Sequence, residues 1–142
     1  MTEPQRPVSR LGHLAGDRLT LYRTPHILVA HGQRSMREGL AGILRRAGYD
    51  VDEAGDFDEA LAVLDKGEVE ALVVSFGFPP DGCLALLDAC KTPPPTVELN
   101  GPVEDTEMVT ADPRVQTVLT RPYPLQALFD AVAQAVGRPE GI

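Results

Sequence analysis

The sequence is poor in cysteine and in aromatic residues, and it has no long hydrophobic run. Its two cysteines, Cys83 and Cys90, have no neighbouring histidine, which argues against a zinc site or a disulfide framework and indicates free thiols in a reducing compartment. Aromatic residues make up 5% of the chain and tryptophan is absent, so leucine, valine and alanine must fill the core. No stretch approaches the ~18 consecutive apolar residues of a membrane span. We therefore expect a cytoplasmic protein that has no membrane partner.

Basic residues are also scarce, with 13 lysines and arginines against 21 aspartates and glutamates and a formal net charge of −8 over 142 residues. Such an acidic surface repels nucleic acid, which is not expected as a partner. The length suits one domain, because domains most often have about 100–150 residues. Proline, glycine and arginine mark residues 1–25 as a partly disordered N-terminal extension. Residues 26–137 are predicted to form the domain, and 138–142 a C-terminal tail.

Within the domain, short apolar runs alternate with stretches of helical periodicity. A helix after the second run is expected to begin at Asp56 or Asp58 and to end at Gly67. Between 101 and 114 the acidic residues leave little apolar face, so the fourth helix should be short or frayed. Strands are predicted over residues 26–30, 49–54, 70–75, 96–99 and 115–120, and the other helices over 35–47, 56–66, 82–91 and 124–136.

This alternation predicts an α/β fold with a five-stranded parallel sheet and helices on both faces. Right-handed crossovers and the flavodoxin-like strand order 2-1-3-4-5 place a binding site at the carboxyl ends of the first, third and fourth strands. The residues to inspect therefore come directly after Ala30, Val74 and Leu99.

Three segments resemble the receiver domain of bacterial two-component response regulators. They are ILVAHGQRSMREGLAGILRRAGYDVDEA over residues 27–54, the strand ALVV before a Pro-Asp-Gly turn over 71–82, and LTRPY over 119–123. The resemblance covers roughly residues 26–136. It implies a module of bacterial signal transduction.

Receiver function uses five polar groups, one of which is a phosphoacceptor aspartate. By the resemblance, the acid pair after the first strand falls on His31 and Gly32, the phosphoacceptor on Ser75, the hydroxyl residue on Asn100 and the lysine on Arg121. All five residues differ from the pattern of the family. The chain is therefore similar to a degenerate receiver, or pseudo-receiver.

The five substituted residues contain no carboxylate and one arginine. Mg²⁺ prefers oxygen ligands, and His31 would be a poor substitute, so no magnesium and no other cofactor is expected. Ser75 lacks an adjacent base other than His31, and an unactivated alcohol is a weak nucleophile. We expect neither aspartyl phosphorylation nor another catalytic activity.

The Arg121-Pro122-Tyr123 segment matches the Lys-Pro-aromatic segment of receivers, which implies a cis bond before Pro122 and a partner contact at Tyr123. Glu98 lies in the middle of a strand that should be buried on both sides, where an unpaired carboxylate is costly. Either Glu98 has a partner or the acidic helix after its strand is displaced, and we expect displacement. Tyr123, Arg121 and Glu98 form the expected partner-binding surface.

The sequence therefore predicts a phosphorylation-independent, atypical response regulator that binds another signalling protein, with a homodimer as a further possibility. An alternative hypothesis is a small-anion or ligand-sensing domain, or an enzyme, that reuses the pocket of His31, Ser75, Asn100 and Arg121. A specific protein partner lost on changing Tyr123 would favour the first hypothesis, and stabilisation by a small molecule lost in Arg121→Ala would favour the second.

Overall fold

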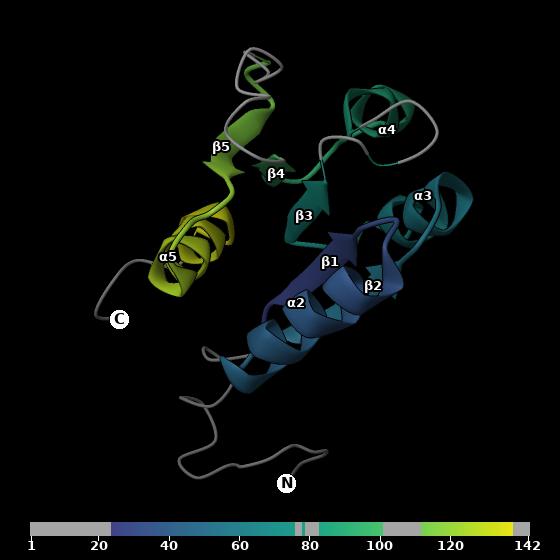
Figure 1. The fold of residues 1–142 in the computed structure, drawn as a ribbon. Helices are drawn as coiled ribbons and strands as arrows, with labels where there is room; N and C mark the ends of the chain where they lie inside the picture. Colours follow the sequence, from purple (N-terminus) through teal and green to yellow (C-terminus); the bar gives the residue numbers. More distant parts are fainter. Residues whose placement is uncertain (1–23, 76–77, 79–82, 101–111, 138–142) are drawn as a thin grey trace, which may run out of the picture.

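A computed structural model describes residues 24–75, 78, 83–100 and 112–137 of the chain. Five strands alternate with four helices in this part of the chain (Figure 1). The strands are β1 (His26–Ala30), β2 (Asp50–Ala54), β3 (Ala71–Ser75), β4 (Thr96–Asn100) and β5 (Val115–Thr120). The helices are α2 (Arg34–Arg46), α3 (Phe57–Asp65), α4 (Cys83–Ala89) and α5 (Leu125–Ala135). Each lies within two residues of its predicted ends.

The five strands form one sheet in the order β2-β1-β3-β4-β5, and every pair is parallel. The predicted flavodoxin-like topology is confirmed. Because all strands run in the same direction, their carboxyl ends lie at one edge of the sheet.

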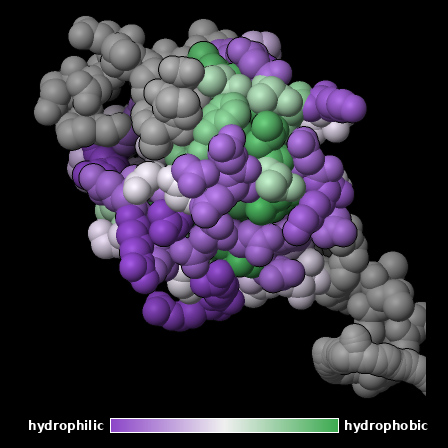
Figure 2. Space-filling model, turned by 90° about the vertical axis from the view of Figure 1, so that its right-hand side faces the viewer, coloured by the Kyte–Doolittle hydropathy of each residue, from purple (hydrophilic) through white to green (hydrophobic). Residues whose placement is uncertain are grey.

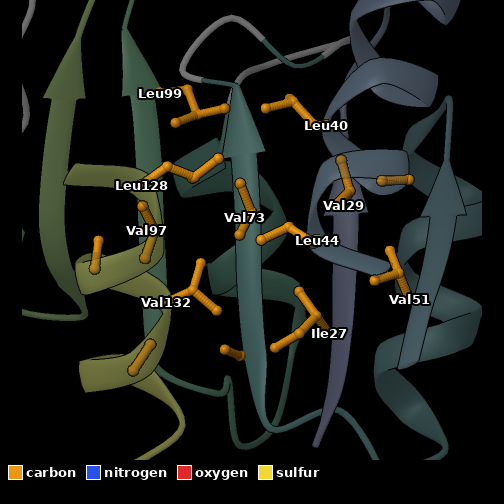
Figure 3. Packing of buried hydrophobic residues seen from close by; sticks show 14 residues of the cluster. Ile27, Val29, Leu40, Leu44, Val51, Val73, Val97, Leu99, Leu128 and Val132 are labelled. Atoms are coloured by element: carbon orange, nitrogen blue, oxygen red, sulfur yellow. The ribbon is translucent and has the colours of Figure 1, made fainter. Parts of the chain in front are cut away.

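Two hydrophobic layers cover the sheet. On one face, α2 and α5 pack on alternate residues of the central strands, with Leu44 and Leu128 next to Val73 (Figure 3). On the other face, α3 and α4 pack on the intervening residues, among them Leu72 and Val74. Figure 2 shows the side of the molecule where α3 and α4 lie, and there an apolar area is surrounded by hydrophilic residues. The residues of this second layer are buried, and hydrophobic side chains at its margin, such as Leu61 and Leu84, are partly exposed.

Helix ends follow the sequence signals. The side chain of Asp56 caps α3, because its Oδ1 accepts a hydrogen bond of 2.9 Å from the backbone N–H of Glu59. Of the two candidate caps, Asp56 is therefore the one used. Gly48 and Gly67 follow α2 and α3 with φ of +103° and +76°, a conformation that glycine adopts without strain.

Three predictions fall outside the described residues. They concern the extension over residues 1–23, the short helix over 101–111 and the tail from 138 onward. No helix in the described ranges is long and apolar enough to cross a membrane.

Candidate functional site

The candidate site lies at the carboxyl edge of the sheet. Ser75 and Asn100 are the last residues of β3 and β4, while His31 follows β1 directly. Ser75 is half-buried and Asn100 is buried, and Gly32 beside His31 is exposed. The topology thus brings the five predicted positions to the same edge, with Arg121 contributed from the segment after β5.

The imidazole of His31 is a neutral hydrogen-bond donor. The backbone N–H of Gln33 donates to its Nδ1 over 3.1 Å, so the ring proton is on Nε2. Burial lowers the pKa of His31 below its usual 6.5, and the positive charges of Arg121 and Arg37 lower it further. His31 therefore presents an N–H group, but no positive charge, at neutral pH.

Arg37 is a site residue that the sequence reasoning missed. Its Nη1 donates to the backbone oxygen of His31 over 3.1 Å, and its Nε lies 3.5 Å from Oε1 of Glu53. Glu53 is shared with Arg45, whose Nη1 lies 3.2 Å from its other oxygen. A Cβ atom at Gly55 would come within 2.7 Å of Nη1 of Arg37, so glycine leaves room for the guanidinium. The sequence predicts a helix over residues 35–47, but helical periodicity does not show which of its polar residues border the site.

The amino end of α2 adds to the positive potential. Gln33 makes no side-chain cap, and the first turn contains no acidic residue. The partial positive charge of a helix amino end is normally offset by such groups. Here Arg34 and Arg37 lie near that end instead, and Arg34 pairs with Glu38 at 2.8 Å.

Arg121 is exposed and forms no ion pair or hydrogen bond with the described residues. The Arg121–Pro122 peptide bond is cis. Tyr123 is half-buried against the layer of α2 and α5, and this burial raises the pKa of its hydroxyl. Leu125, at the start of α5, is 48% exposed. Between β5 and α5 the chain therefore presents a cation, an aromatic ring and an aliphatic side chain close together in sequence.

Solved structures of receiver domains match this architecture. A response regulator receiver domain from Clostridium thermocellum matches with a TM-score of 0.71 and 20% identity, over 80% of this chain and 95% of its own. The chemotaxis response regulator CheY4 of Vibrio cholerae matches with a TM-score of 0.66 and 18% identity, over 80% of this chain and 99% of its own. The receiver domain of the hybrid histidine kinase CckA matches with a TM-score of 0.63 and 26% identity, over 78% of this chain and 98% of its own. The chain has the receiver-domain fold. No family model and no curated protein matches the sequence.

Within this receiver fold the site is rich in positive charge. The charges of Arg37 and Arg121 act on His31 at this edge, and Glu53 is the carboxylate that pairs with Arg37. In the described ranges, no group of three or more His, Cys, Asp or Glu side chains is arranged to hold a metal ion.

Glu98 lies in the middle of β4, as the sequence predicts. Its side chain is fully buried, so the expectation that it contributes to a partner-binding surface is wrong. As residues of β4 alternate, Val97 and Leu99 join the layer of α2 and α5, and Glu98 points to the opposite side. The expected displacement of the acidic helix concerns residues outside the described ranges.

Proposed function

We propose that this chain is a pseudo-receiver, a signalling module that works without aspartyl phosphorylation and acts by binding another protein. The observation that carries the proposal is the charge at the carboxyl edge of the sheet. By the resemblance, His31, Gly32 and Ser75 match the positions of the three receiver carboxylates, and Arg37 and Arg121 lie close enough to His31 to lower its pKa.

Neither Mg²⁺ nor a catalytic step is part of the proposed function. A hard divalent cation needs several oxygen ligands, which the matched positions do not supply. Ser75 has no carboxylate-oriented base among the described residues, and a serine needs such a base to act as a nucleophile. Without the metal, the charge of a transferring phosphoryl group would lack its main counter-ion.

The proposed contact surface is the segment from Arg121 to Leu125. Its half-buried Tyr123 and exposed Leu125 offer apolar contact area next to a cation, a combination common at the centre of protein interfaces. Proteins with this fold include response regulators and the receiver of a hybrid histidine kinase. A two-component signalling protein is therefore the proposed partner, and a second copy of this chain is the other candidate.

An affinity capture from the host organism tests both parts of the proposal. The tagged wild-type chain should retain a specific partner, and it should do so equally with and without Mg²⁺ and a small phosphodonor. Tyr123→Ala should lose the partner, whereas Gln134→Ala, an exposed change on α5, should keep it. A partner that binds only after phosphodonor treatment would contradict the proposal.

A second candidate function is the sensing of a small oxyanion at the carboxyl edge. The specific observation is that Arg121 has no ion pair in the described chain, close to the Nε2–H of His31 and the uncapped amino end of α2. Inorganic phosphate should then raise the melting temperature more than chloride at equal ionic strength. Loss of that difference in Arg121→Ala would support this candidate, and equal effects of both salts on the wild-type chain would exclude it.

A further inference from the structure

β4 carries a row of polar side chains on the face that α4 covers. Thr96, Glu98 and Asn100 alternate with Val97 and Leu99, and all three polar residues are buried. The hydroxyl of Thr96 donates to the backbone oxygen of Pro94 over 2.9 Å. In contrast, both carboxylate oxygens of Glu98 and Nδ2 of Asn100 have no hydrogen-bond partner within the described structure. Polar groups buried in this way are uncommon and costly.

The neighbours of Glu98 in the sheet are apolar. Val74 of β3 and Val118 of β5 are in register with Glu98 on either side. Across from it lies Cys83, the first residue of α4, within a layer that also holds Leu86 and Leu87. No cation in the described chain compensates a negative charge at this point.

Cys83 is the titratable group that faces Glu98 from α4. Burial and the nearby Glu98 raise the pKa of its thiol to about 12, so it stays uncharged at physiological pH. Arg114 pairs with Asp112 at 2.6 Å and with Asp88 at 2.8 Å, so it is not a free cation for Glu98. Burial therefore dominates, and it raises the pKa of Glu98 to about 7.

An ionised Glu98 needs contact with water, so one of the elements packed around it must move. The rearrangement required is different for β3, β5 and α4. β3 and β5 are hydrogen-bonded to β4 along its length, so their displacement would break the sheet. α4 has only seven residues, and its first turn offers Glu98 no donor stronger than the thiol of Cys83, which is a weak one. Movement of that turn is the smaller rearrangement.

We propose that Glu98 and the first turn of α4 form a proton-operated switch, in which the turn covers protonated Glu98 and moves off when the proton passes to water. The switch does not depend on the proposed partner or on the absence of phosphorylation. Movement of the turn would also affect the candidate site, because Asn100 lies two residues after Glu98 on the same face of β4 and is the last residue of that strand.

Cys83 provides a direct reporter of this movement. Its side chain is 1% exposed, so a thiol reagent such as iodoacetamide reaches it only when the first turn of α4 opens. The experiment uses the full chain with Cys90→Ser, which leaves Cys83 as the single thiol. Rates are compared between this background and the same background with Glu98→Gln, because the comparison at each pH cancels the intrinsic pH dependence of the thiol.

The labelling rate with Glu98 divided by the rate with Glu98→Gln should rise roughly seventyfold between about pH 5 and about pH 8, if opening returns the Glu98 pKa from about 7 to 4.5. Glu68→Gln, an exposed change, should leave the rate unchanged. Hydrogen exchange should show faster exchange in α4 at the higher pH, while the buried amides of β1 stay protected.

Two results would overturn the proposal. One is a labelling ratio that stays flat over this pH range. The other is exchange of α4 and β1 at the same rate, since that would show unfolding of the whole domain rather than movement of one turn.

Discussion

Replacing Glu98 with glutamine should stabilise the protein above neutral pH. The wild-type carboxyl is fully buried and has no hydrogen-bond partner in the described chain, and its pKa is raised from 4.5 to about 7. The unfolded chain exposes the same group to water. Since one unit of pKa corresponds to about 1.4 kcal/mol, ionisation of Glu98 costs the folded state about 3 kcal/mol. Glutamine has nearly the same shape and does not ionise.

The sign of the pH dependence follows from which state holds the proton. Below about pH 4.5 both states are protonated, and Glu98 has no effect on the pH dependence. Between 4.5 and about 7 the unfolded chain releases its proton while the folded chain keeps it, so the free energy of unfolding falls as pH rises. Above about pH 7 the free energy of unfolding stays lower by this full amount. His31 acts in the opposite direction, because its lowered pKa makes the folded state gain stability as pH rises through its usual 6.5.

The assay is denaturant unfolding followed by circular dichroism at about pH 5 and about pH 8, with Glu68→Gln as an exposed control. Glu98→Gln should match the wild type within about 1 kcal/mol at the lower pH and exceed it by about 3 kcal/mol at the higher pH. For a domain of this size the gain corresponds to roughly 10 °C in melting temperature. An equal effect of the substitution at both pH values would refute the reasoning.

Two further predictions concern α3 and the candidate site. Asp56→Ala should lower the free energy of unfolding by about 1 kcal/mol, measured by urea titration, because it removes the cap of α3, and an unchanged midpoint would contradict this. Arg121→Ala and Arg37→Ala should each raise the pKa of His31, since each removes a positive charge that lowers it. An NMR titration of the ring measures the shift, and a pKa that stays the same or falls would show that these charges do not act on the ring.

The fold was predictable because its signals are local. Continuous apolar runs marked the strands that are buried on both faces. The last four residues of β1 and the first four residues of β3 are buried. Gly67 marked the end of α3, where it adopts a conformation that other residues avoid. The flavodoxin-like strand order followed from the alternation of strands and helices and from right-handed crossovers.

Contacts between distant elements were harder to predict. The role of Arg37 depends on its reach across the edge to His31 and Glu53, and helical periodicity does not encode that reach. The burial of Glu98 could be anticipated from its place in an apolar strand, but its lack of a partner could not, because that depends on what α4 sets opposite it.

The central claim is that the site does not accept a phosphoryl group. Its most direct test is the intact mass of the chain after incubation with a small phosphodonor and Mg²⁺. The triple variant with His31→Asp, Gly32→Asp and Ser75→Asp restores three carboxylates and serves as the comparison. The wild-type mass should stay unchanged under conditions in which a known receiver gains one phosphoryl group. A wild-type chain that gains one phosphoryl group, and loses that gain in Ser75→Ala, would contradict the claim.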